Sequence, residues 1–188
     1  MPDTLARQLP DVAESPWLHR LPPASRFILQ GGAAARGAAA LVWGVEFSDA
    51  PCRAMVHGER ATLWLGPDEH LLLDRTGTAG AAVERALGQT LSATPHSLVD
   101  VSHRQFALEV SGPRAAAILN GACPLDLDPE RFPVGMCTRT VLGKAEIVLW
   151  RPRADAFHLE VWRSFAGYVG GLLGEIADQL DPREPTGG

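Results

Sequence analysis

The chain has 188 residues, of which 46% are hydrophobic and 21% charged, so it is long enough to bury a core without disulfides or a structural metal. A net charge of -5 offers no basic footprint for a phosphate backbone, which argues against nucleic-acid binding. No apolar stretch reaches the roughly 20 residues of a membrane helix, and the first residues lack the features of a signal peptide. We therefore expect a cytoplasmic protein that does not enter the membrane.

The two ends of the chain differ in composition from its middle. Residues 1–24 contain five prolines and no sustained periodicity, which predicts an extended arm. Within this arm, Trp17 and Leu18 are expected to dock either on the chain's own core or on another chain. The tail, residues 181–188, is expected to be flexible, which leaves a single domain over residues 25–180.

Strand-like and helical patterns alternate inside this domain. The glycine-rich stretch 31–37 predicts a flexible turn region. The elements that follow are a hairpin of strands 62–65 and 70–74, a helix after Thr78, a second hairpin of strands 97–101 and 105–110, a helix from Pro113 to Gly121, strands near 137–142, 145–150 and 157–163, and a helix behind Ser164. Repeated hairpin–helix units of this kind predict an α+β fold with a mainly antiparallel sheet.

The last two strands predict a surface that needs cover. Trp150 and Trp162 each precede an arginine and point away from the apolar face of their strands, because alternate strand residues face opposite sides. A sheet with tryptophans on its second face needs cover from the N-terminal arm, from another subunit or from a local helix. We include both tryptophans, with Trp17 and Leu18, among the candidate interface residues.

The final helix has two unlike faces. Its predicted apolar stripe consists of Phe165, Val169, Leu172, Leu173, Ile176 and Leu180. The nearly opposite side carries four glycines, Gly167, Gly170, Gly171 and Gly174. Each glycine weakens a helix by roughly 1 kcal/mol relative to alanine, which favours close approach by another element or subunit at this face. The alternative is compositional drift in a chain rich in alanine and glycine.

No pattern of side chains predicts catalysis or cofactor binding. The histidines show no HxH or HxxxH spacing, and Cys52, Cys123 and Cys137 are odd in number and far apart, which predicts reduced thiols and no metal site. The cluster of Asp100, Ser102 and His103 lacks a GxSxG motif, so hydrogen bonds that pin the following turn are favoured over a hydrolase triad. GxGxxG and P-loop motifs are also missing from the sequence, and we expect no cofactor on this chain.

Several motifs carry a resemblance to a known family. The run HSLVDVSHRQ at 96–105 and the run ALEVSGPRAAAILNGACPLDL from 107 resemble the gamma subunit of heterotetrameric sarcosine oxidase. The segments LGPDE, FPVGMCTRT, IVLWR and FHLEVWRSFA match that family in order and spacing. The resemblance covers residues 60–175 and is looser over the arm and residues 25–60.

This resemblance implies a non-catalytic structural subunit of an oxidoreductase complex. In such a heterotetramer, alpha, beta and delta subunits carry FAD, FMN, NAD and tetrahydrofolate. The complex oxidises sarcosine to glycine, hydrogen peroxide and formaldehyde or methylene-tetrahydrofolate, which places it in sarcosine catabolism and one-carbon metabolism.

A more distant resemblance supports an alternative function. Asp100-Val-Ser-His and the helix after Gly112 look like the start of the folate-binding domain of the glycine-cleavage T-protein family. That family has an acidic pair in the next hairpin, whereas here only Glu146 is acidic. The alternative is therefore a free-standing folate-dependent aminomethyl or one-carbon transfer protein.

Overall fold

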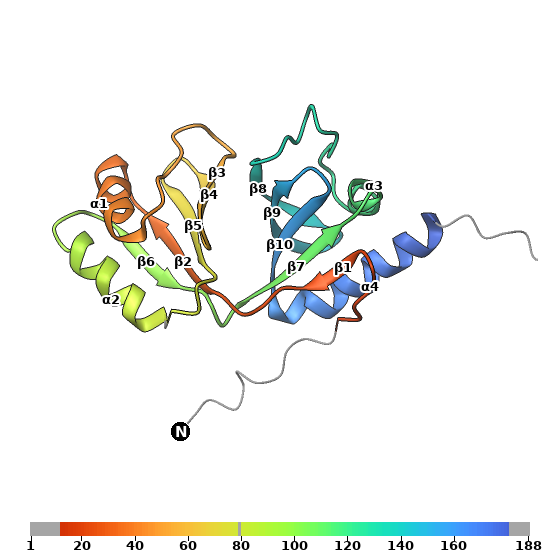
Figure 1. Ribbon diagram of the computed structural model, residues 1–188, viewed down its shortest axis with the longest axis horizontal. Coiled ribbons are helices and arrows are strands. Elements are labelled where there is room, and N and C mark those ends of the chain that lie inside the picture. Colours follow the sequence, from red (N-terminus) through yellow and green to blue (C-terminus); the bar gives the residue numbers. More distant parts are fainter. Residues whose placement is uncertain (1–11, 79, 181–188) are drawn as a thin grey trace, which may run out of the picture.

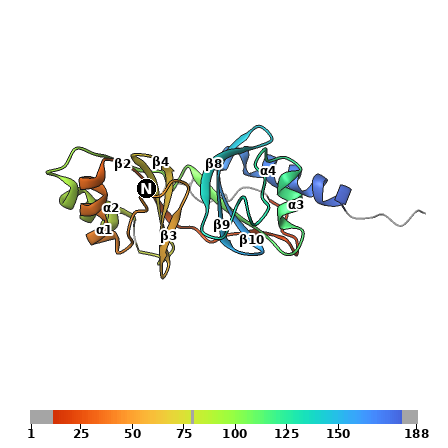
Figure 2. The same ribbon diagram turned by 90° about the horizontal axis from the view of Figure 1, so that it is seen from above.

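The computed structural model describes residues 12–78 and 80–180, which form two five-stranded antiparallel sheets (Figure 1). The N-sheet has the strand order β3 (Ala54–His57), β4 (Arg60–Gly66), β5 (Glu69–Asp74), β2 (Ser25–Gln30) and β6 (Ser97–Asp100). The C-sheet has the order β1 (Leu18–Arg20), β7 (Gln105–Ser111), β10 (Ala156–Trp162), β9 (Ala145–Arg153) and β8 (Cys137–Leu142). The inner faces of the two sheets are turned towards each other (Figure 2).

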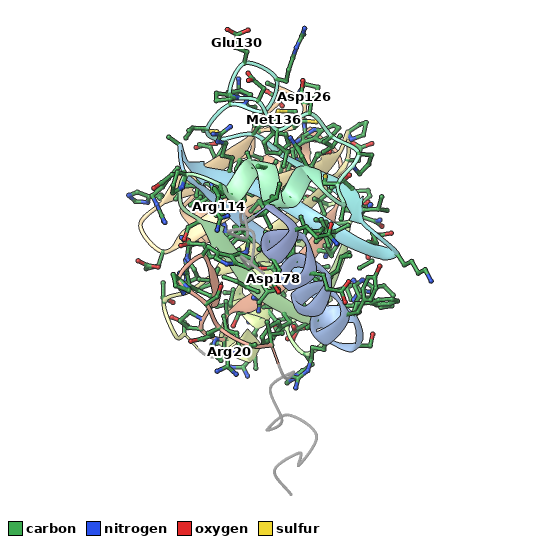
Figure 3. All side chains as sticks on the ribbon, turned by 90° about the vertical axis from the view of Figure 1, so that its right-hand side faces the viewer. Arg20, Arg114, Asp126, Glu130, Met136 and Asp178 are labelled. Atoms are coloured by element: carbon green, nitrogen blue, oxygen red, sulfur yellow. The ribbon has the colours of Figure 1, made fainter. Side chains whose placement is uncertain are left out.

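Helices cover the outer face of each sheet. Helices α1 (Ala33–Trp43) and α2 (Gly80–Leu91) lie on the N-sheet. Helices α3 (Ala115–Asn120) and α4 (Arg163–Leu180) lie across the C-sheet and contact each other (Figure 3). The resulting order of layers is helices, sheet, sheet, helices. This confirms the predicted α+β class and the antiparallel pairing, whereas the sequence predicted one sheet and the structure has two. Within the described ranges, no helix is both long and apolar enough to cross a membrane.

The two sheets are built from one repeated topology. The series β2-α1-β3-β4-β5-α2 and the series β7-α3-β8-β9-β10-α4 have the same order along the chain and the same sheet neighbours. The strand that precedes each series crosses to the other sheet, so β1 pairs with β7 and β6 pairs with β2, both antiparallel. The crossing connections, residues 21–24 and 101–104, therefore hold the two halves together.

This exchange of strands corrects one predicted hairpin. The hairpin predicted for 62–65 and 70–74 is present as β4 and β5. The second, predicted for 97–101 and 105–110, is wrong, because β6 belongs to the N-sheet and β7 to the C-sheet. A short connection between two strands suits a hairpin and a sheet-to-sheet crossing equally well, and the long-range partners decide between them.

The prediction of a flexible turn region over residues 31–37 is also wrong, except for its first two residues. Helix α1 begins at Ala33, and its alanine-rich sequence is a strong helix former. The helix ends at Gly44, which adopts the left-handed conformation with φ 75° and donates its N–H to the Ala40 carbonyl. The two glycines before α1 mark the start of a helix instead of a longer loop.

Three apolar cores follow from strand alternation. The outer faces of β9 and β10 contribute the predicted residues to the core under α3 and α4, among them Ala145, Leu149 and Phe157. A second core lies between the N-sheet and its helices, around Trp43 and Phe27. A third fills the space between the sheets and consists of Ala61, Leu63, Leu71, Leu73, Val101, Cys137, Val148 and Trp150.

The described part of the predicted arm, residues 12–24, lies along the C-sheet and contributes β1 to it. Leu18 is buried in the C-sheet core, and Trp17 packs against that core while partly exposed. Of the two partners considered for this pair, the structure provides the chain's own core. Residues 1–11 and the predicted tail, 181–188, lie outside the described residues.

Candidate interaction surface

The two strand tryptophans have different surroundings. Trp150 is only 3% exposed and belongs to the core between the sheets, with its ring centroid 5.6 Å from that of His158. Its cover is the N-sheet, which was not among the three kinds of cover that the sequence suggested. Trp162 is 41% exposed, and the Arg104 guanidinium lies 4.8 Å from its ring centroid. Trp162 therefore remains the strand tryptophan that can meet a partner.

Two further exposed aromatic residues follow Trp162 in the chain, on α4. Phe165 and Tyr168 are 39% and 40% exposed, and their rings form an edge-to-face contact at 6.5 Å. The Tyr168 hydroxyl accepts a hydrogen bond from the Lys144 backbone N–H at 3.2 Å. We call these three exposed residues the aromatic patch, in which Phe165 and Tyr168 lie on α4 and Trp162, at the end of β10, borders the opening between the sheets beside Ile28 and Val99. Exposed aromatic rings beside an arginine are typical of binding hot spots.

The buried face of α4 is rotated relative to the apolar stripe that the sequence predicted. The buried positions are Ala166, Val169, Leu173 and Ala177, whereas Phe165 and Leu180 are exposed. Two of the buried residues are alanines, which let the helix lie close to the C-sheet. A pattern drawn from large apolar side chains alone shifts towards Phe165 and therefore misses the aromatic patch as a surface feature.

The glycine face of α4 lies against the chain's own N-terminal segment. A groove of about 460 Å³ is bounded by residues 12–15, 17 and 18 on one side and on the other by Gly167, Gly170, Gly171, Gly174 and Asp178. A Cβ atom on Gly170 would lie 2.7 Å from Val12 Cγ1, whereas at Gly171 and Gly174 it would meet nothing within 4 Å. Close approach to another element therefore exists at Gly170, and that element is the arm.

A buried polar cluster joins the two sheets. Arg26 of β2 donates from Nε to Glu160 of β10 at 2.6 Å, and His158 Nε2 lies 2.7 Å from the other Glu160 oxygen. Burial raises the pKa of the Glu160 carboxyl, but Arg26 and His158 outweigh this and hold the pKa below its ordinary value. The carboxylate therefore stays charged between the sheets and fixes their relative position.

Asp100 and Ser102 pin the crossing turn after β6. The Ser102 N–H donates to the Asp100 carboxylate at 2.8 Å, and the Arg26 N–H donates to Ser102 Oγ at 2.8 Å. These contacts confirm the predicted hydrogen bonds around the turn. His103 is exposed. The Ser102 hydroxyl thus serves the crossing connection and is not placed as a nucleophile.

A cavity of about 420 Å³ lies beside the two crossing connections, 21–24 and 101–104. The charged side chains in its wall include Arg26, Asp74 and Arg163. Arg26 is paired with Glu160, and the Asp74 carboxylate with Arg60 at 3.0 Å. In the chain from 12 to 180, residue 79 aside, no group of three His, Cys, Asp or Glu side chains could hold a metal ion.

Comparison with solved structures first identifies the class of fold. The glycine cleavage system aminomethyltransferase T from Bartonella henselae has a TM-score of 0.63 at 14% identity, over 83% of this chain and 44% of that protein. Heterotetrameric sarcosine oxidase from Corynebacterium sp. U-96, in complex with pyrrole 2-carboxylate, contains a chain with a TM-score of 0.81 at 26% identity. That match covers 89% of this chain and 86% of that chain. The chain thus has the fold that these two proteins share.

The family follows from sequence. The sarcosine oxidase gamma subunit family matches residues 30–178, and the chain belongs to it. Sarcosine oxidase subunit gamma from Corynebacterium sp. (strain P-1) is 35% identical over 109 residues, which are 58% of this chain and 52% of that protein. The subunit from an Arthrobacter species is 36% identical over 101 residues, or 53% and 47% of the two chains. The matched region spans about half the length of these relatives.

Proposed function

We propose that this chain is the gamma subunit of a heterotetrameric sarcosine oxidase and that its role there is structural. The observation that carries the proposal is the likeness to a chain of the solved heterotetramer, with a TM-score of 0.81 over 89% of this chain. Family membership over residues 30–178 supports the same conclusion.

The proposed partners are the alpha, beta and delta subunits, with FAD, FMN, NAD and tetrahydrofolate held by those partners. The assembled enzyme would oxidise sarcosine to glycine and hydrogen peroxide, and release the methyl carbon as formaldehyde or methylene-tetrahydrofolate. A structural role agrees with how this chain uses its buried charged groups. Arg26, Glu160 and His158 bind one another between the sheets.

The aromatic patch is the part of this chain that we propose to contact a partner subunit. Aromatic side chains bury a large area at low cost in conformational entropy, and Arg104 adds a cation beside Trp162. Truncation of a hot-spot residue typically costs about 2 kcal/mol or more of binding free energy. All three residues are exposed by at least 39%, so their replacement should cost less stability than replacement of a fully buried core residue.

Co-expression with the three partner chains tests the proposal. We expect the unaltered chain to co-purify with them, and Trp162→Ala with Phe165→Ala to bind at least about tenfold more weakly. Leu41→Ala is the matched control, because Leu41 is an apolar residue of α1 that is 85% exposed. It should leave assembly unchanged.

Two results would contradict the proposal. One is full assembly and sarcosine-dependent peroxide production by the partner subunits in the complete absence of this chain. The other is binding of tetrahydrofolate by the isolated chain together with transfer of a one-carbon group, which would establish the free-standing transfer protein instead.

A further inference from the structure

Two cysteines from different halves of the chain lie opposite each other where the sheets meet. An isolated antiparallel bridge links Arg53, just before β3, to Met136, just before β8. Next to this bridge, the Cys137 N–H donates to the Cys52 carbonyl at 2.9 Å. Cys52 and Cys137 are therefore directly opposed residues on two antiparallel segments.

The spacing of opposed residues suits a disulfide. The 2.9 Å hydrogen bond from the Cys137 N–H to the Cys52 carbonyl holds the two Cα atoms within about 7 Å of each other, close to the range of roughly 4.4 to 6.8 Å that a disulfide spans. The two thiols are also near enough for Cys52 to affect the pKa of Cys137. Both are free thiols. Cys123, the third cysteine, is buried elsewhere, with its sulfur 4.0 Å from Thr140 Oγ1.

The two thiols differ in access to solvent. Cys52 is partly exposed and has a φ of 57°. Among residues 12–78 and 80–180, it is the only residue other than glycine whose φ is positive. Cys137 is fully buried, and its thiol points to the Trp64 carbonyl at 3.6 Å. Burial raises the pKa of the Cys137 thiol to about 12. An oxidant from solution therefore reaches Cys52 first.

We propose that Cys52 and Cys137 form a peroxide-oxidised thiol pair that locks the two sheets together. The Cys52 thiolate attacks hydrogen peroxide, whose O–O bond breaks, and becomes a sulfenic acid with release of one water. The Cys137 sulfur then displaces the sulfenic oxygen as a second water, and the S–S bond forms. Two thiols and one peroxide thus give one disulfide and two waters. The proposal needs only peroxide and is independent of the proposed function.

The expected consequence is a covalent link between the start of β3 in the N-sheet and β8 in the C-sheet. The link closes a loop from residue 52 to residue 137. Closing so long a loop removes much conformational entropy from the unfolded chain and thereby stabilises the folded one. Because Cys137 is a thiol and not a thiolate at neutral pH, the second step should be the slower one.

The experiment uses the full chain, treated with hydrogen peroxide, blocked with N-ethylmaleimide and digested with trypsin without reduction. Trypsin separates the three cysteines into the fragments 37–53, 115–131 and 132–139. We expect fragments 37–53 and 132–139 to appear as one linked species that dithiothreitol separates. The oxidised protein should melt roughly 5–15 °C higher than the reduced protein.

Matched variants make the test specific. Cys52→Ser should abolish the linked species and the shift in melting temperature, whereas Cys123→Ala should leave both in place. If Cys52→Ser destabilised the chain, Cys137→Ala would provide the same comparison from the other side. The proposal is overturned if Cys52 proceeds to sulfinic acid with Cys137 unchanged, or if peroxide links Cys52 to Cys123.

Discussion

The outer and inner faces of the two sheets are both buried, but by different kinds of contact. On the outer faces, α1 and α2 or α3 and α4 cover side chains that are almost all apolar. On the inner faces, the apolar core between the sheets lies beside Arg26, Glu160 and His158, each of which is buried. Apolar contacts fix how helices cover a sheet, whereas the charged cluster fixes how one sheet faces the other, because its geometry tolerates little displacement.

The largest expected effect comes from breaking this charged cluster. Glu160→Ala leaves the Arg26 guanidinium buried without its partner, and such a change typically costs about 3–5 kcal/mol. Equilibrium unfolding in urea measures the loss. The matched control is Glu109→Ala, on the neighbouring strand β7, which removes a partly exposed ion pair with Arg153. We expect about 0–1 kcal/mol there.

A double variant separates the missing charge from the missing packing. Arg26→Met with Glu160→Met removes both charges and fills the space with apolar side chains, so it should recover most of the stability lost in Glu160→Ala. A double variant as unstable as the single one would mean that the hydrogen bonds of Arg26, and not an unpaired charge, set the cost.

The sequence predicted the burial of the outer faces better than that of the inner faces. The outward positions of β9 and β10, such as Leu149 and Phe157, followed from alternation because one apolar face needs only local helices to cover it. The cover of Trp150 could not be predicted, because it comes from strands far away in the sequence. The same holds for the crossing of β6, since a four-residue connection does not reveal which sheet its strands join.

The candidate surface was predicted in part for a similar reason. Trp162 was predicted to need cover and is exposed in this chain, but Phe165 was assigned to the buried stripe because large apolar side chains dominate the helical pattern. The burial of Ala166 and Ala177 depends on how closely α4 approaches the C-sheet. That distance is a tertiary property, which the sequence of one helix does not contain.

The second largest effect is expected at a polar exception on an outer face. His70 of β5 is 1% exposed, its ring nitrogens find no hydrogen-bond partner among the described residues, and its ring centroid lies 5.1 Å from that of Phe47. Burial lowers the pKa of His70 to about 4, and Arg36 acts in the same direction. Since the unfolded histidine takes up a proton near pH 6.5, the stability present above that pH should fall by about 2–3 kcal/mol as the pH drops to 4.

Urea unfolding across this pH range measures the effect. His70→Phe should remove the slope between pH 6.5 and 4 and should be at least as stable at pH 7, because no polar ring nitrogens remain buried. His103→Gln is the control, since His103 is exposed, and should keep the slope. The stability that Glu160 contributes should be lost at lower pH. Its pKa is lowered in the folded chain, so this loss begins only when the pH falls through the ordinary pKa range of a glutamate.

A smaller effect is expected where the arm meets α4 on the outer side of the C-sheet. Gly170→Leu should displace Val12, because even a Cβ atom would lie 2.7 Å from Val12 Cγ1. Overpacking of this kind typically costs about 1–3 kcal/mol. Thermal unfolding measures the cost, and faster cleavage of the N-terminal segment by protease would report its release. An unchanged melting temperature would show that the contact with Val12 adds nothing to stability.

The smallest effect, of opposite sign, is expected one turn further along the same helix. A Cβ atom on Gly174 meets nothing within 4 Å, so alanine fits there without displacing the arm. Alanine is the better helix former by up to about 1 kcal/mol, and Gly174→Ala should therefore raise the free energy of unfolding of the isolated chain by up to that amount.

The same variant also tests the glycine face as a docking surface. If a partner's backbone packs against Gly174 in the assembled enzyme, Gly174→Ala stabilises the isolated chain and weakens its co-purification with the partner subunits. If assembly is unchanged while the isolated chain gains stability, the glycine face serves the arm alone, and contact with partners belongs to the aromatic patch.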